Sequence, residues 1–372
     1  MRHNILIATG IYPPSVGGPA TYSFFLFHEL PKMGLQTLVY SFDEVRKLPK
    51  VIRHIQYFLG VLRRGFGVRM IYAQDPVSVG LPALFAARLL RKPFIIRIAG
   101  DYAWEQATQR FDVHEHLDTF AGKDGPYPFF VRILKRVQAY VATRADVVIV
   151  PSQYLKQVLV KWGVKPQNIR VIYNSVDVPF FDTKANLRKK FNLEGCVIFS
   201  AGRLVQWKGF NALIEIMPEI LKKDKGCSLF IAGDGPERPT LKRLIAKYKL
   251  EDCVFLVGKL PREEVLEFVK ASDIFVLNTA YEGFSHVALE VMAVGTPLIT
   301  TRAGGNTELI EHMHDGLLVE YNDHKALRDA IVTIKDDPIF AQTLVQNARK
   351  KLERFSKEKM IKELVAQLGE SL

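Results

Sequence analysis

The stretch IFVLNTAYEGFSHVALEVMAVGTPLIT, residues 274–300, decides the fold class. It opens with an apolar run at 274–277, continues into a helical pattern that we expect to begin near Ser285, and closes with a second apolar run at 298–300. Short continuous apolar runs that alternate with helices are typical of parallel strands buried on both faces of a sheet. The stretch therefore predicts a β-α-β unit of an α/β protein.

The same alternation extends along most of the 372 residues and predicts two doubly wound parallel sheets. A turn-rich segment at 174–179 separates two sets of apolar runs, so we expect one domain over 1–177 and a second over 178–356. Residues 357–368 have an amphipathic helical pattern, whereas 100–128 lack clean periodicity and are interpreted as a long functional or mobile connection. The predicted strands are 4–8, 36–40, 70–73, 94–98, 147–150 and 170–172, then 197–200, 228–231, 254–257, 274–277 and 298–300.

The formal net charge of +12 is distributed unevenly along the chain. Residues 1–177 hold 23 Lys and Arg against 12 Asp and Glu, whereas 178–372 are nearly balanced at 28 and 27. A basic surface attracts nucleic acid, an anionic membrane or phosphorylated small molecules. Basic amphipathic patterns at 51–64 and 129–137 leave two interpretations open: helices packed on the sheet with a solvated basic face, or helices lying on an anionic membrane.

Targeting and partner signals are sparse. The three cysteines form no C-x-x-C pair, which argues against a disulfide framework and a structural zinc site. We find no signal peptide and no run of about 18 apolar residues, so we expect a protein that lies in the cytoplasm or at the inner face of the cell membrane. Because no nucleic-acid-binding motif accompanies the basic charge, we expect no nucleic-acid partner.

Two glycine-containing loops follow predicted strands and could hold phosphate. Gly17 and Gly18 lie between the first strand and a helix, where the backbone can approach an anion closely. Arg203 and Lys208 lie five residues apart after the first strand of the second half, and two such cations can clamp a diphosphate. The alternatives are a tight structural turn for the first loop and a solvated basic loop for the second.

The segment 282–290 contains the sharpest candidate site. Glu282 precedes the predicted helix and Glu290 lies in its second turn, so the two carboxylates can take hydroxyl groups at opposite ends of a ligand. The alternative for Glu290 is a solvated helix carboxylate, but its apolar neighbours favour a buried, ligand-facing side chain. The backbone amides that open the helix and can receive phosphate oxygens belong to Gly283, Phe284, Ser285 and His286.

Together these motifs resemble the family 4 (group 1) retaining glycosyltransferases of the GT-B fold, over essentially the whole chain. The most specific matches are Gly202-Arg203-Leu204 with Lys208-Gly209, Ala232-Gly233-Asp234-Gly235-Pro236, Glu282-x7-Glu290, Ala293-Val294-Gly295-Thr296-Pro297 and Gly304-Gly305.

The resemblance implies two Rossmann-like domains that face each other across a cleft, with a last helix at 357–372 crossing back to the N-terminal domain. It implies that the N-terminal domain binds the acceptor and the C-terminal domain binds a nucleotide diphosphate sugar. It implies that Arg203 and Lys208 bind the diphosphate, that Glu282 binds the donor sugar, and that the backbone of 283–286 binds the sugar and phosphate. It further implies that Glu290 binds the ribose and that the backbone around Val257 and Gly258 binds the base. Gly17 and Gly18 would close over the diphosphate.

One position departs from the family pattern. Members often carry a His at the end of the fourth strand of the first domain, where this chain reads Ile98-Ala99-Gly100-Asp101-Tyr102. Asp101 is our candidate for that place, which would make it a catalytic residue together with Glu282, Arg203 and Lys208.

The resemblance implies transfer of a hexose-type sugar from a nucleotide diphosphate sugar to a hydroxyl acceptor, with retention at the anomeric carbon. We expect no cofactor, because the nucleotide sugar is a substrate, and no metal, because the chain has no D-x-D pair. The basic first half favours a saccharide or lipid-linked acceptor of the cell envelope and peripheral contact with an anionic membrane. The alternatives are a GT-B relative of other activity, such as a nucleotide-sugar epimerase or a glucan synthase, and a non-catalytic sugar-nucleotide-binding protein.

Overall fold

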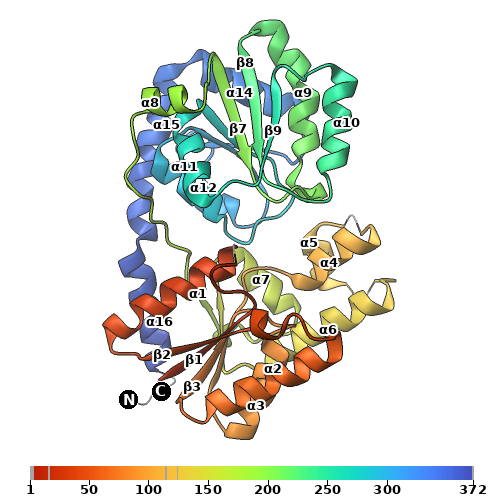
Figure 1. The fold of residues 1–372 in the computed structure, drawn as a ribbon, viewed down its shortest axis with the longest axis vertical. Helices are drawn as coiled ribbons and strands as arrows, with labels where there is room; N and C mark the ends of the chain where they lie inside the picture. The colour runs from red at the N-terminus through yellow and green to blue at the C-terminus, as the bar shows by residue number, and fades with distance from the viewer. Residues whose placement is uncertain (1–3, 16, 114, 124, 371–372) are drawn as a thin grey trace. The chain divides into compact units, whose positions relative to one another are not determined.

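A computed structural model describes residues 4–15, 17–113, 115–123 and 125–370. The chain divides into two compact units, one of residues up to Tyr173 together with those from Glu358 onward, the other of Asn174–Lys357. Each unit contains a six-stranded parallel sheet with helices on its faces, which confirms the predicted α/β class (Figure 1). The predicted boundary near residue 177 lies four residues beyond the junction.

The first unit contains a sheet in the order β2-β1-β3-β4-β5-β6. Its strands confirm the six apolar runs predicted in the first half: the inner strands β1, β3 and β4 are fully buried, whereas the edge strands β2 and β6 are partly buried. The strands are β1 Ile5–Thr9, β2 Thr37–Ser41, β3 Met70–Ala73, β4 Phe94–Arg97, β5 Val147–Val150 and β6 Ile169–Val171. The helices are α1 Gly18–Glu29, α2 Lys50–Gly65, α3 Gly80–Leu90, α4 Tyr102–Phe111, α5 Leu117–Gly122, α6 Phe129–Arg144, α7 Gln153–Lys161 and α16 Lys357–Gly369.

The last helix of the chain completes the core of this first unit. The apolar side of α16, with Met360, Ile361, Leu364 and Leu368, packs with Leu26 of α1 and with strand residues such as Ile7 and Ile149. Burial of such an apolar stripe is the main force that docks a terminal helix. The C-terminal segment therefore belongs to the same unit as β1, although the whole second unit separates the two in sequence.

The second unit contains a sheet in the order β12-β11-β10-β7-β8-β9. Five of its strands were predicted; the sixth, the three-residue strand β12, was missed. The strands are β7 Cys196–Ala201, β8 Cys227–Ala232, β9 Val254–Gly258, β10 Ile274–Leu277, β11 Leu298–Thr301 and β12 Leu317–Val319. The helices are α8 Lys184–Lys190, α9 Phe210–Lys223, α10 Arg238–Tyr248, α11 Arg262–Ala271, α12 His286–Val294, α13 Asn306–Leu309, α14 His324–Asp336 and α15 Pro338–Lys351.

The interpretation of 100–128 as a long connection was wrong. Residues in this range form α4 and α5, while residues 114 and 124 lie outside the described part. Asp101 caps α4 by accepting a hydrogen bond from the backbone N–H of Trp104 at 2.9 Å. The two helices are short, so neither produces the sustained apolar period that marks a long amphipathic helix.

Candidate functional site

The strand order of the second unit reverses its direction at one point. β7 and β10 are neighbours, and the connections that follow them lead to opposite sides of the sheet, β8 on one side and β11 on the other. In open parallel sheets, ligands bind outside the carboxyl ends of the strands at this reversal of order. The loop of Arg203 and Lys208 follows β7, and the loop of Glu282 follows β10. The fold thus brings together two candidate loops that lie more than 70 residues apart in sequence.

The loop that carries Arg203 is held against the loop after β8. Leu204 is fully buried, and its backbone N–H donates to the carbonyl of Asp234 at 3.0 Å. A Cβ on Gly235 would lie 2.3 Å from the Leu204 carbonyl oxygen, so only glycine permits this approach. The Arg203 side chain is exposed, with its guanidinium carbon 5.4 Å from the ring centre of Trp207. The glycines of the 232–236 motif therefore position the arginine loop.

Lys208 forms an ion pair with Glu282, which joins the loops that follow β7 and β10. The two side chains are only 18% and 16% exposed, so the charges are largely shielded from water. Lys208 ends a 3₁₀ turn, Gln206–Lys208, and Gly209 follows it with φ +55°. A Cβ on Gly209 would lie 2.3 Å from the amide nitrogen of Asn278, which donates to the Gly209 carbonyl at 2.8 Å. The structure therefore brings the residue predicted to bind phosphate, Lys208, into direct contact with the residue predicted to bind the sugar, Glu282.

The segment 283–286 connects this ion pair to α12. Ser285 caps the helix by accepting a hydrogen bond from the Ala288 N–H at 3.2 Å, as the predicted helix start requires. Phe284 is buried and its carbonyl accepts a hydrogen bond from the Asn174 side chain at 3.0 Å. A Cβ on Gly305 would lie 2.3 Å from the carbonyl oxygen of Gly283, so the 304–305 motif allows this loop to pack tightly. His286 is exposed at the first position of α12.

Glu290 lies in α12 and is paired with an arginine that sequence reasoning missed. Arg262 donates from Nε to a Glu290 carboxylate oxygen at 2.7 Å, and it also donates to the Asp177 carbonyl at 2.9 Å. The Glu290 side chain is 17% exposed. Burial raises the pKa of Glu290 above its usual value, and the nearby positive charge of Arg262 offsets part of that rise. No local pattern signals this pair, because 28 residues separate its members.

Val257 and Gly258 end β9, the edge strand beyond β8. Gly258 has φ +81°, and its carbonyl accepts a hydrogen bond from the Gly233 N–H at 2.7 Å. The predicted base-binding backbone is thus hydrogen-bonded to the loop after β8, and that loop in turn packs against the loop that contains Arg203.

The remaining predicted residues belong to the first unit. Gly17 and Gly18 open α1, which has no side-chain cap, and a Cβ on Gly18 would meet no heavy atom within 4 Å. The open space beside Gly18 suits the predicted approach of a ligand to the backbone.

Asp101 caps helix α4 in this unit. Its Oδ1 accepts hydrogen bonds from the Trp104 N–H and the Gln138 amide, both at 2.9 Å. Its side chain is fully buried, and within the described residues its Oδ2 has no hydrogen-bond partner. Burial raises the pKa of Asp101 to about 6. The geometry explains the residue as a helix cap, and a contact with a sugar would require the buried Oδ2 to become accessible.

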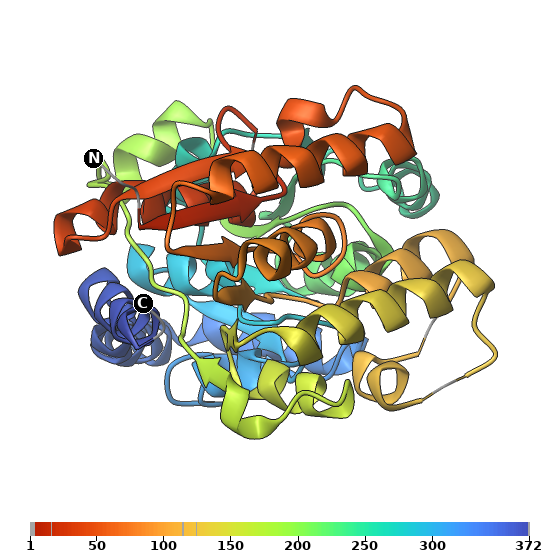
Figure 2. The same cartoon turned by 90° about the horizontal axis from the view of Figure 1, so that it is seen from below.

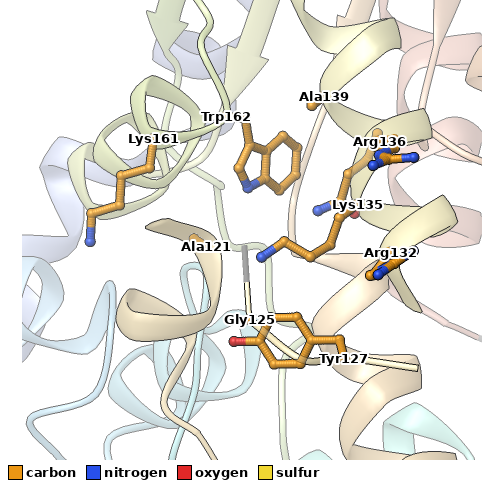
Figure 3. A pocket seen from close by; sticks show the side chains of 10 residues that line it. Ala121, Gly125, Tyr127, Arg132, Lys135, Arg136, Ala139, Lys161 and Trp162 are labelled. Atoms are coloured by element: carbon orange, nitrogen blue, oxygen red, sulfur yellow. The ribbon is translucent and has the colours of Figure 1, made fainter. Parts of the chain in front are cut away.

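A cationic cavity in the first unit was not predicted. It has a volume of about 310 Å³ and lies between α5, α6 and the end of α7 (Figure 3). Arg132, Lys135 and Arg136 come from α6, and Lys161 with Trp162 comes from the end of α7. Among the described residues the buried indole N–H of Trp162 has no acceptor. Sequence reasoning identified the basic segment at 129–137 but not the helices that would face it.

Two family models match the chain. The model of glycosyl transferases group 1 matches residues 183–351, and that of glycosyltransferase family 4 matches residues 16–179. Each half of the chain thus matches a glycosyltransferase family model. The chain is 30% identical over 228 residues to an uncharacterized glycosyltransferase of Methanocaldococcus jannaschii, covering 59% of this chain and 58% of that protein. It is also 29% identical over 260 residues to LpsD of Rhizobium meliloti, a lipopolysaccharide core biosynthesis glycosyltransferase, covering 70% of this chain and 71% of that protein.

The chain spans little more than half the length of the first of these relatives. Among solved structures, sucrose-phosphate synthase from Thermosynechococcus elongatus superposes with a TM-score of 0.81 at 21% identity, with 100% of both chains covered. HepE of Anabaena, in complex with UDP, superposes with a TM-score of 0.77 at 20% identity, covering 99% of this chain and 100% of HepE. These likenesses confirm the predicted GT-B fold.

Proposed function

We propose that this glycosyltransferase moves a hexose-type sugar from a nucleotide diphosphate sugar to a hydroxyl acceptor, with retention and without a metal. The observation that carries the proposal is the Lys208–Glu282 pair, with Arg203 on the same loop, at the carboxyl ends of β7 and β10. A cation and a carboxylate in contact fit a ligand that carries a diphosphate beside a sugar, because phosphate oxygens accept hydrogen bonds and sugar hydroxyls donate them.

The reaction creates negative charge on the leaving group. The bond between the anomeric carbon and the phosphate oxygen breaks, and the nucleoside diphosphate departs as an anion. Lys208, Arg203 and the N-terminal amides of α12 stabilise that anion by electrostatic preorganisation. Lys208 then turns from Glu282 toward phosphate, and the carboxylate of Glu282 accepts hydrogen bonds from the sugar. Glu290 accepts hydrogen bonds from the ribose.

Retention follows from attack on the face that the leaving group vacates. The acceptor oxygen forms the new bond to the anomeric carbon while its proton passes to an oxygen of the departing phosphate. No protein nucleophile is needed, so Glu282 and Glu290 act as binding residues. The charges of Arg203 and Lys208 take the place that a divalent cation fills in metal-dependent transfer.

The acceptor domain is proposed to be the first unit, and the acceptor a saccharide or lipid-linked saccharide of the cell envelope. The net charge of +11 in residues 1–177 supports an anionic acceptor or surface. The relationship to LpsD, a lipopolysaccharide core biosynthesis enzyme, supports the same class. We place the protein in the cytoplasm, in peripheral contact with an anionic membrane. Within the described residues no helix combines the length and the apolar character needed to cross a bilayer.

The experiment is a donor screen followed by analysis of the released sugar. UDP-glucose is the first probe, because HepE has been crystallised with it; GDP- and ADP-hexoses are the comparison. Thermal stabilisation identifies the nucleotide. Slow hydrolysis of the bound donor, followed by proton NMR, should release the α-anomer first from an α-linked donor. Initial release of the β-anomer contradicts retention, an epimerised nucleotide sugar indicates an epimerase, and binding without turnover of any donor indicates a non-catalytic protein.

A further inference from the structure

The helices α2, α3 and α6 form one layer on a face of the first sheet, with α3 between the other two (Figures 1 and 2). The two basic amphipathic segments that the sequence predicts, 51–64 and 129–137, are thus parts of a single surface. We call this surface the α2–α3–α6 face.

Apolar side chains on this face do not pack into the core. α2 buries Tyr57 and Val61 against the sheet, whereas its apolar stripe points outward. Val51 is 73% exposed and Ile55 is 55% exposed. The same holds for Leu89 of α3 and Phe129 of α6, which are 67% and 70% exposed. An exposed apolar surface of this extent marks an interaction site rather than an ordinary protein surface.

A groove of about 750 Å³ runs between the three helices. Apolar side chains line most of it, including Ile55, Phe58, Leu81, Phe85, Ile133 and Val137. Two polar side chains, His54 and Arg88, also contribute to the lining. A groove of this composition fits a hydrocarbon chain, because such a chain gains from leaving water and makes no hydrogen bonds.

The charges on the same helices have one sign. α2, α3 and α6 contain nine Lys and Arg residues and no Asp or Glu. Arg64 pairs with Glu44 at 3.2 Å and Arg88 with Asp146 at 3.6 Å, so two of these charges are compensated from neighbouring segments. Arg132 and Arg136 have no ion pair among the described residues and also line the cavity of Figure 3. Cations that can take phosphate therefore lie on the same helix as the apolar groove.

We propose that the α2–α3–α6 face binds the surface of an anionic phospholipid membrane. Apolar side chains enter the acyl-chain boundary, and the arginines of α6 contact lipid phosphates. A second copy of the chain fits less well, since a two-fold interface would set these cations against each other with no carboxylate on the three helices to compensate. The inference deepens the proposed function and rests on it, because membrane binding would bring the first unit to a lipid-linked acceptor held in that membrane.

Vesicle flotation without donor or acceptor tests the proposal. The full chain should float with phosphatidylcholine vesicles containing 30% phosphatidylglycerol and not with pure phosphatidylcholine vesicles, and 0.5 M salt should weaken the binding. The double variant Arg132→Gln/Arg136→Gln should bind about 30-fold more weakly, from the loss of two cations near the anionic surface. The double variant Ile55→Glu/Phe85→Glu should not float.

Matched changes in the second unit provide the control. Ile339→Glu replaces a side chain that is 80% exposed on α15, and Lys222→Gln/Lys225→Gln removes two exposed cations; both variants should float like the unchanged protein. UDP binding and thermal unfolding, measured on every variant, separate a failure of this proposal from a failure of the donor site or of folding.

Three results would overturn the proposal. They are equal flotation with both kinds of vesicle, undiminished flotation of the α2–α3–α6 variants, and a dimer in light scattering that Phe85→Glu abolishes while no vesicle binds. The last result would assign the face to a second copy.

Discussion

Replacing Asp101 by Asn separates a helix cap from a catalytic group. The carboxylate is fully buried, and its Oδ2 has no partner among the described residues. A folded-state pKa of about 6, against an ordinary 3.8, means that ionisation costs the folded protein about 3 kcal/mol. Because the pKa is raised, that cost is absent below about pH 4 and fully present above pH 6, so Asp101 lowers stability as pH rises through this window.

Asn keeps the oxygen that accepts from Trp104 and Gln138 but cannot ionise. Its buried amide N–H group costs about 1–2 kcal/mol, so Asp101→Asn should be more stable than the unchanged protein by about 1–2 kcal/mol at pH 7.5 and less stable at pH 4. Asp101→Ala loses the cap and should be destabilised by about 1 kcal/mol or more at pH 4. Calorimetric unfolding of the full chain at both pH values measures these differences, and sugar transfer by the Asn variant should persist. An Asn variant that is less stable at pH 7.5 and has lost transfer refutes the capping account.

Three further changes address the second unit. Lys208→Met should weaken UDP binding about 10- to 100-fold. The double variant Lys208→Met/Glu282→Gln should lose less free energy of unfolding than the sum of the losses of the two single variants, because each single variant leaves one shielded charge without its partner. Additive losses of unfolding free energy would contradict this coupling. Gly235→Ala places a methyl group 2.3 Å from the Leu204 carbonyl and should cost about 3 kcal/mol in calorimetric unfolding, whereas a cost near zero would show that the loops are loosely packed. Glu290→Gln should lower affinity for UDP about tenfold and leave affinity for 2′,3′-dideoxy-UDP nearly unchanged, as measured by calorimetric titration; an equal loss for both nucleotides excludes a ribose contact.

Most strands could be predicted from the sequence because parallel strands buried on both faces are unbroken apolar runs, as at 147–150 and 274–277. The start of α12 could be predicted too, because Ser285 is a strong helix cap before an apolar run. The helices within 100–128 were missed, since they contain too few turns to set an apolar period; β12 was also missed, although the equally short β6 was predicted.

The candidate site was only partly visible for a different reason. Arg203, Lys208 and Glu282 could be identified, because each belongs to a local motif after a strand. The pairing of Lys208 with Glu282 depends on the neighbouring positions of β7 and β10, and that of Arg262 with Glu290 on the packing of α11 beside α12. Such contacts follow from topology, which no local pattern contains. For the same reason the sequence did not show that 51–64 and 129–137 share one face.

The central claim is that the loops after β7 and β10 bind the nucleoside diphosphate of a sugar donor. Calorimetric titration of UDP, GDP and ADP into the full chain tests it most directly, with Lys208→Met as the site variant and Lys225→Met, an exposed lysine of the same unit, as the control. The account predicts that one nucleotide binds, that Lys208→Met weakens it at least tenfold, and that Lys225→Met leaves it unchanged. Equal binding by the two variants, or no binding of any nucleotide, would contradict it.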